Sequence, residues 1–225
     1  MRSIAMTFSL LAVLGLVRPL AAAEKGRQLD VQSPAGEFAG WKSFSAEPGT
    51  STGQVWKLGD DGVLACRGKP LGYLYTEKDY GDFTLRLEWR WPEGKPGKGG
   101  VLLRKSGPDK IWPKSLEAQI NAPDAGDFWG LGGYALAGPA ERLKQIAHPK
   151  FGQLTNLKKL EMVERPAGQW NQYEIRAEGA SVTLVVNGRQ VNRATACETP
   201  PGRICLTAEG SQIFFRNVEL EPRER

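Results

Sequence analysis

The stretch Phe83-Thr84-Leu85-Arg86-Leu87-Glu88-Trp89-Arg90-Trp91 decides the fold class of this chain. Every second residue in it is large and apolar, and the residues between are polar or charged. Successive side chains of a β-strand point to opposite faces of a sheet, so a period of two predicts a long strand with one face on an apolar core.

Similar short alternating runs, punctuated by Gly, Pro, Asn and Asp, fill the rest of the chain, and helical periodicity is almost absent. Asn187-Gly188 separates two such runs, which is a strong hairpin signal. We therefore predict an all-β fold, a two-sheet antiparallel sandwich of the jelly-roll type. The other candidate strands are Gln54–Leu58, Val63–Arg67, Gly72–Thr76, Val101–Arg104, Leu116–Ile120, Asn171–Ala177, Ser181–Val186, Arg189–Ala194, Arg203–Thr207 and Gln212–Leu220.

One segment departs from this rhythm. Residues 138–166 are rich in Lys and Arg, and a short helix is expected near Ala140–Ile146. Long excursions from compact β domains are either functional lids or solvated insertions, and the sequence leaves both readings open.

The N-terminus has the pattern of a secretory signal peptide. Arg2 precedes an apolar run from Ile4 to Val17, and small residues end at Ala23. We predict cleavage near Ala23, a single mature domain over residues 24–225, and export to the periplasm or the medium. No later stretch is apolar for long enough to span a membrane.

Charge and rare residues exclude several classes of function. The chain has 30 basic and 25 acidic residues; without Arg2 and Arg18 the net charge falls from +5 to +3 (28 minus 25), and the basic residues are scattered, which argues against nucleic-acid binding. The single histidine, His148, excludes a His-rich zinc site, although a site with oxygen ligands stays open. In an oxidising compartment Cys197 and Cys205 are candidates for a disulfide, while Cys66 is expected to be a buried apolar residue.

A second alternating run, Leu116 to Asn121, carries the candidate chemistry. Leu116, Ala118 and Ile120 are expected on one face, and Glu117, Gln119 and Asn121 on the other. A carboxylate flanked by two amides is suited to holding a polyhydroxylated ligand, and a plain solvated face is the alternative reading.

Ordinary two-acid glycoside hydrolysis is disfavoured by the same run. Some sandwich glucanases carry both carboxylates on one strand, but here Gln119 and Asn121 occupy the positions after Glu117. A second carboxylate would have to come from another segment, and the candidates are Asp124, Asp127, Glu88 and Glu209. Flat aromatic rings for stacking on a sugar are expected among the loop residues Trp112, Trp129, Tyr134 and Trp170, although most tryptophans fill cores.

Several motifs in order make the chain similar to the 3-keto-disaccharide hydrolase family, also called 3-keto-glucoside lyase/hydratase. They include Phe38-Ala39-Gly40-Trp41-Lys42, Gly72 to Phe83, Glu117-Ala118-Gln119, Gly126-Asp127-Phe128-Trp129 and Glu209 to Val218. The resemblance implies a concanavalin-A-like jelly roll. Two departures are visible, because many members have Asn-Ser where this chain has Lys98-Gly99, and Gln where it has Thr207.

The resemblance implies cleavage of 3-keto-glucosides or 3-keto-disaccharides by β-elimination followed by hydration, which amounts to net hydrolysis. A C3 ketone acidifies the C2 proton, so the site needs a base, a cation or donor for the enolate, and an acid for the leaving oxygen. The roles expected are Glu117 or Asp127 as base or metal ligand and Arg104 as enolate stabiliser. Gln119, Asn121, Trp129 and Glu88 would contact substrate, and Glu209 would act as the acid.

Alternatives accompany each of these roles. Arg104 could pair structurally with Glu88 or Glu117, and Glu209 could serve only the turn beside Gly210. No cofactor is required, although a divalent metal ion with unknown ligands could stabilise the enolate instead. The partner is expected to be a carbohydrate; the rival functions are a non-catalytic, lectin-like glycan-binding domain and a structural envelope protein. The anomer, aglycone and oligomeric state are left open.

Overall fold

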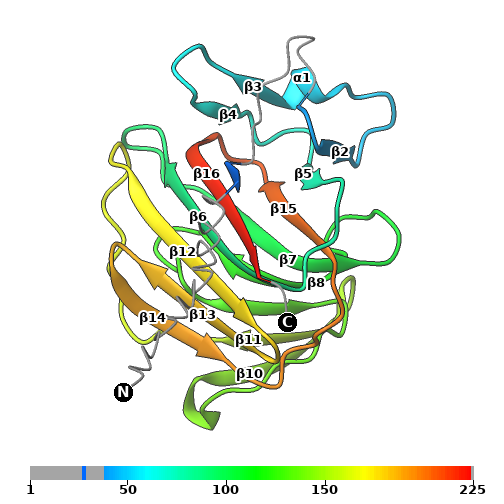
Figure 1. Ribbon diagram of the computed structural model, residues 1–225, viewed down its shortest axis with the longest axis vertical. Coiled ribbons are helices and arrows are strands. Elements are labelled where there is room, and N and C mark those ends of the chain that lie inside the picture. The colour runs from blue at the N-terminus through cyan, green and yellow to red at the C-terminus, as the bar shows by residue number, and fades with distance from the viewer. Residues whose placement is uncertain (1–26, 29–37, 224–225) are drawn as a thin grey trace, which may run out of the picture.

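The computed structural model describes residues 27–28 and 38–223, and the predicted signal peptide lies outside these residues. Two antiparallel sheets face each other across one core, which confirms the predicted sandwich (Figure 1). Sheet A consists, in spatial order, of β14 (Arg189–Ala194), β13 (Ser181–Val186), β12 (Asn171–Glu178), β6 (Asp82–Arg90), β16 (Ile213–Arg223), β4 (Leu64–Cys66) and β3 (Trp56–Leu58), with β1 (Arg27–Gln28) beside β16. Sheet B consists of β10 (Leu143–His148), β11 (Gly152–Leu157), β9 (Phe128–Leu131), β8 (Lys114–Gln119), β7 (Gly100–Ser106), β15 (Arg203–Ala208), β5 (Gly72–Thr76) and β2 (Trp41–Ser45).

The core lies where the period-two patterns predict it. Phe83, Leu85, Leu87, Trp89 and Trp91 are all buried against the opposite sheet. Removal of this apolar surface from water stabilises the sandwich, at roughly 25 cal/mol per Å². Leu116 and Ala118 of β8, together with Ile120, face the same core, so the alternation places Glu117 and Gln119 on the outer face of sheet B.

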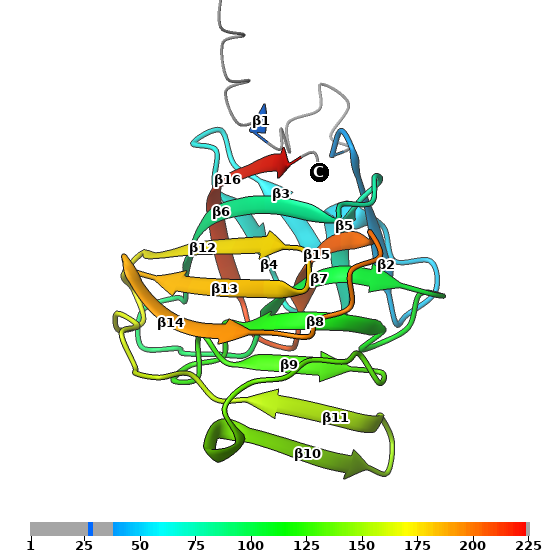
Figure 2. The same ribbon diagram turned by 60° about the horizontal axis from the view of Figure 1, so that its bottom comes forward.

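The segment after Gly138 is part of sheet B. The expected helix near Ala140–Ile146 is wrong, because only Ala140–Arg142 form a helical turn (η1) and the chain then enters β10. β10 and β11 form a hairpin that pairs with β9 and extends past the edge of sheet A, as Figure 2 shows. Residues 143–157 of the excursion therefore extend one sheet, with most of β10 exposed, whereas residues 158–166 form neither helix nor strand.

Smaller differences concern the N-terminal strands and the cysteines. The predicted strand Gln54–Leu58 begins as the short helix α1 (Thr52–Val55), and only Trp56–Leu58 form β3. Cys66, Cys197 and Cys205 are all buried free thiols, so the expected Cys197–Cys205 bridge is absent. Within the described residues, no helix is long and apolar enough to cross a membrane.

A β-bulge in β7 turns Arg104 away from the outer face of sheet B. The register of β7 with β8 shifts between Leu103 and Ser106, and Arg104 has a φ of 51°, so the alternation changes phase here. Lys105, rather than Arg104, lies over the rings of Tyr73 and Tyr75 on the outer face.

The Arg104 guanidinium is buried in a shell of acceptors. It donates hydrogen bonds to the carbonyl oxygens of Gly81 (3.0 Å), Gly179 (3.0 Å) and Glu198 (2.5 Å), and it pairs with Asp82 at 3.3 Å. The Arg104 side chain thus connects three loops to the bulge. A planar guanidinium with several N–H donors can bond these acceptors at the same time.

We predict that Arg104→Met destabilises the protein by about 3 kcal/mol, because it removes a buried guanidinium that donates to three carbonyls and pairs with Asp82. Urea unfolding followed by tryptophan fluorescence measures this. Arg193→Met, which changes an exposed arginine on β14, is the control and should shift the midpoint little. An Arg104→Met protein of full stability that loses all turnover would instead restore a catalytic role for this residue.

Candidate active site on the outer face of sheet B

Neighbouring strands of sheet B align one row of side chains on the outer face. Glu117 is directly opposite Leu102 of β7 and Trp129 of β9, and Gln119 is opposite Gly100. Although this face points away from the core, Glu117 is only 5% exposed and Gln119 only 8%. The row that the sequence predicted is therefore a covered site and not a solvated surface.

A second carboxyl group, that of Glu209, lies near Glu117. Glu209 follows β15 directly, two strands away from β8 in the sheet. Burial raises the pKa of Glu117 well above its ordinary value, and the charge of Glu209 raises it further. Burial also raises the pKa of Glu209, although the Thr207 hydroxyl and the Lys98 ammonium act in the opposite direction. Glu117 is therefore the member of the pair that holds a proton more firmly.

Gly100 provides the space that the Glu117 carboxyl group occupies. A Cβ atom at position 100 would lie 2.4 Å from Glu117 Oε1 and less than 3 Å from its Cγ and Cδ atoms. Thr207 fixes this glycine, because its hydroxyl accepts a hydrogen bond from Gly100 N–H (2.7 Å) and donates one to Gly100 C=O (3.1 Å). The glycine and the threonine together determine where Glu117 points.

The Glu209 side chain faces a groove with a volume of about 570 Å³, into which Lys98 also faces. Glu209 Oε1 is buried and has no hydrogen-bond partner among the described residues. A buried carboxylate oxygen without a partner is costly, and such atoms mark places where a ligand or water completes the bonding. This oxygen and the groove together identify the candidate active site.

Two other expected site residues lie in or beside this arrangement. Trp129 packs against the apolar cluster that covers the outer face, directly beside Glu117. The Asn121 amide oxygen accepts a hydrogen bond from Gly99 N–H at 2.7 Å. Asn121 therefore positions the Lys98–Gly100 segment, whereas Trp129 is placed to contact a ligand.

Asp127 is held in a separate cluster of charges. It is 1% exposed, it pairs with Lys158 Nζ at 3.1 Å and Lys159 Nζ at 3.6 Å, and it accepts the Lys159 N–H at 3.0 Å. Both oxygens of Asp127 are thus engaged by lysine side chains, so the geometry favours a structural role for Asp127.

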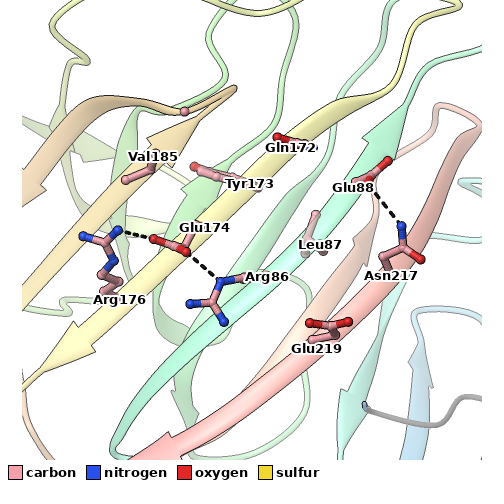
Figure 3. A pocket seen from close by; sticks show the side chains of 11 residues that line it. Arg86, Leu87, Glu88, Gln172, Tyr173, Glu174, Arg176, Val185, Asn217 and Glu219 are labelled. Carbon is pink, nitrogen blue, oxygen red and sulfur yellow. Dashed lines mark hydrogen bonds and ion pairs between the residues drawn. The ribbon is translucent and has the colours of Figure 1, made fainter. Parts of the chain in front are cut away.

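Glu88 and Arg104 do not join Glu117. The Arg104 guanidinium is engaged by the loop carbonyls and by Asp82, as described above. Glu88 lies on the outer face of sheet A, on the opposite side of the sandwich, where it pairs with Arg216 at 2.7 Å and accepts a hydrogen bond from Asn217. Figure 3 shows it in a shallow polar groove whose ion pairs include that of Arg86 with Glu174.

The loop aromatics divide between the two sides. Trp112 and Trp129 belong to the apolar cluster on the outer face of sheet B. Trp170 lies on the other side beneath the guanidinium groups of Arg90 and Arg216, and the buried Tyr134 donates its hydroxyl proton to Glu198 C=O. Of these four residues, only Trp112 lines the groove, and Trp129 lies beside Glu117.

Metal binding has little support from the side chains present. Among the described residues, no group of three or more His, Cys, Asp or Glu side chains is arranged to hold an ion. Glu117 and Glu209 are two carboxylates, which even as bidentate ligands offer four oxygens, fewer than the six to eight that Ca²⁺ usually receives.

Comparison with known proteins assigns the chain to a family. The model of the 3-keto-alpha-glucoside-1,2-lyase-like domain matches residues 34–221. The chain belongs to this family. This membership makes it a carbohydrate-active type of domain. No curated protein matches the chain in sequence.

Solved structures confirm the jelly roll. A Parabacteroides distasonis ATCC 8503 protein with a provisional glycosyl hydrolase name has a TM-score of 0.57 and 17% identity, over 83% of this chain and 90% of that one. The carbohydrate-binding module CBM66 of Bacillus subtilis has a TM-score of 0.55 and 15% identity, over 81% of this chain and 95% of that one. The Bacillus licheniformis β-glucanase has a TM-score of 0.55 and 11% identity, over 88% of this chain and 97% of that one. At these identities the likeness is one of fold.

Two further site residues, Lys98 and Phe151, were not indicated by the sequence patterns. Lys98 differed from the family pattern, but only the fold shows that its charge acts on Glu209. Phe151 belongs to the turn between β10 and β11, in the segment taken for an excursion. The contact of its ring with Trp112 joins two loops far apart in the sequence.

We predict that Glu209→Gln lowers the pKa of Glu117, because the substitution removes the negative neighbour while leaving burial nearly unchanged. Carboxyl ¹³C chemical shifts of glutamate-labelled protein, followed as a function of pH, measure this. Glu88→Gln, a carboxylate on the far side of the sandwich, should leave the Glu117 titration unchanged. Equal Glu117 curves in wild type and Glu209→Gln would show that the two groups are not coupled.

Proposed function

We propose that this protein cleaves 3-keto-glucosides by β-elimination and hydration, with Glu209 as the base and Glu117 as the acid. The observation that carries the proposal is the pair itself: the buried Glu117 and the half-buried Glu209, both with raised pKa values, beside a groove, in a member of this family. Burial and mutual repulsion favour a single proton on such a pair, which gives one proton acceptor and one proton donor.

The first step breaks the C2–H bond of the sugar. The Glu209 carboxylate takes the proton, and the electron pair moves into an enolate on the C3 oxygen. Lys98 is the cation nearest to this event, since its charge acts on Glu209, and it takes the role that the sequence had given to Arg104. The enolate then expels the C1 substituent, and Glu117 gives its proton to the leaving oxygen.

The second step reverses these proton transfers. Glu117, now ionised, takes a proton from water as the water oxygen bonds to C1 of the enone. Protonated Glu209 returns its proton to C2, which restores the ketone and both carboxyl groups. The sum is hydrolysis of the glycosidic bond, and Trp129 beside Glu117 provides a flat face for the sugar ring. We place this activity in the periplasm or the medium, on the strength of the N-terminal pattern alone.

The two glutamates are expected to differ in their response to the leaving group. Glu117→Gln should slow release of a sugar from a 3-keto-disaccharide by about 10²–10⁴-fold, but slow release of 4-nitrophenolate much less, because that anion leaves without a proton. Glu209→Gln should slow both substrates to a similar extent, since both need the C2 proton removed. Stopped assays of aglycone release, with enone absorbance followed in parallel, provide the comparison; the reversed pattern would exchange the two roles.

The substitution Gly100→Ala tests the position of the proton donor Glu117 while both carboxyl groups are retained. The new methyl group must displace the Glu117 carboxyl, and a shift of about 1 Å can cost about 10²-fold in kcat/KM. Gly99→Ala is the matched control, because its Cβ would make only ordinary van der Waals contacts, with the Trp91 ring at 3.4 Å, Ile213 at 3.7 Å and the Thr207 hydroxyl at 3.9 Å. Melting temperatures close to wild type confirm that both variants fold; equal activities would count against the proposed position of Glu117.

Glycan binding without turnover is the rival outcome of these assays. A folded protein that binds unoxidised glucosides, releases nothing from 3-keto-glucosides under any metal condition, and keeps its affinity in Glu209→Gln would be a sugar-binding module.

A further inference from the structure

The groove beside the glutamate pair has an aromatic wall made by two loops. Trp112, from the loop between β7 and β8, packs on Phe151 of the β10–β11 turn, with ring centroids 4.0 Å apart. The backbone of Trp112 has a φ of 54°, a left-handed conformation that is costly for a bulky residue. Such strained positions are found at ligand clamps, and here the strain holds the indole against the groove. Leu71, 42% exposed, and the buried Leu102 also line the groove.

The polar groups of this groove are poorly suited to a second sugar. The Tyr73 hydroxyl donates to Asp109 at 2.8 Å, and the Thr207 hydroxyl is bonded to Gly100. Besides Glu209, the charged side chains that line the groove are those of Lys98, Lys110 and Lys150. Ammonium groups donate hydrogen bonds but accept none, whereas a sugar presents hydroxyls that need both kinds of partner.

The lysines leave a positive charge without a partner at the aromatic wall. Lys110 is two residues before Trp112, and Lys150 Nζ lies 5.4 Å from the centroid of the Phe151 ring. In the described part of the chain, neither has a carboxylate within ion-pair distance, in contrast to Lys105, Lys114 and Lys158. An anionic group at this end of the groove would complete the pairing that the protein itself does not supply.

From these observations we infer that the groove binds the aglycone of the substrate, and that this aglycone is an aromatic ring bearing a carboxylate. The ring lies against Trp112 and Phe151, and the carboxylate pairs with Lys110 and Lys150. Glycosides of phenolic acids have this chemistry. The inference rests on the proposed function for its reaction, but the binding itself does not depend on turnover.

The test compares two aglycones that differ only in charge. The 4-carboxyphenyl and 4-carbamoylphenyl 3-keto-glucosides are nearly the same size, and both are assayed as each anomer. The expected kcat/KM is about tenfold higher for the carboxylate, which corresponds to one charge-assisted contact at a partly exposed site, and the preference should shrink as salt is added. The double variant Lys110→Gln/Lys150→Gln should lose most of the preference. Lys144→Gln, which removes the same charge from the exposed face of β10, should keep it.

Equal kcat/KM for the two aryl substrates, or a higher value for a 3-keto-disaccharide than for both, would overturn the inference. Absence of turnover with every substrate would refute the proposed reaction. Calorimetric titration with the unoxidised 4-carboxyphenyl and 4-carbamoylphenyl glucosides then decides the groove separately. Tighter binding of the carboxylate, abolished by the double variant, supports the inference, whereas equal binding or no binding of the two rejects it.

Discussion

A buried carboxyl group and a half-buried one within electrostatic reach of each other cannot both be ionised without a cost in free energy, and the site on sheet B is organised around that constraint. Glu117 is covered by the apolar cluster that includes Trp129 and Leu102, so its neutral form is the favoured one. Burial raises the pKa of Glu209 as well, but the Lys98 charge and the Thr207 hydroxyl act against that rise. In the proposed mechanism these two different environments make an acid of Glu117 and a base of Glu209, as burial and neighbouring charge do elsewhere in enzymes.

The two departures from the family pattern, Lys98 and Thr207, lie beside the Glu117–Glu209 pair. Lys98 stands where many relatives have Asn, and it is the charge that acts on Glu209. Thr207 stands where many have Gln, and its short side chain bonds both backbone groups of Gly100. A longer amide at position 207 would extend from the same face of β15 toward the ligand. The threonine instead stabilises the backbone beside Glu117, so these two substitutions change how the pair is supported and leave the pair itself in place.

The sequence predicted the sandwich because its evidence is local: period-two patterns and turns suffice to find strands such as Gly72–Thr76 and Ser181–Val186, whose bounds agree with the structure. It predicted Glu117 and Gln119 on one face for the same reason, whereas Trp129 was expected in a loop and lies on β9. Arg104 was misplaced because a bulge inserts one residue and reverses the alternation, and no local pattern marked it. β10 was read as helix because an isolated amphipathic run of six residues fits either period, and pairing with β11 settles the choice. The order of the strands in sheet B brings Glu209 close to Glu117, and an alternating sequence pattern gives no information on strand order.

Chemistry and aglycone recognition occupy different kinds of structure in this protein. Glu117 and Gly100 lie on central strands of sheet B and Glu209 directly follows another, so the register of the sheet holds the reacting groups rigidly. The aromatic wall comes instead from a bulged loop and from the hairpin turn at the sheet edge, which can vary without disturbing the core. Replacing Phe151 or Lys150 would therefore alter which aglycone binds, with the carboxyl pair unmoved. Relatives that share the sandwich but differ in the β10–β11 turn should accept the same oxidised sugar and different leaving groups, because the sugar meets the strands and the leaving group meets the turn.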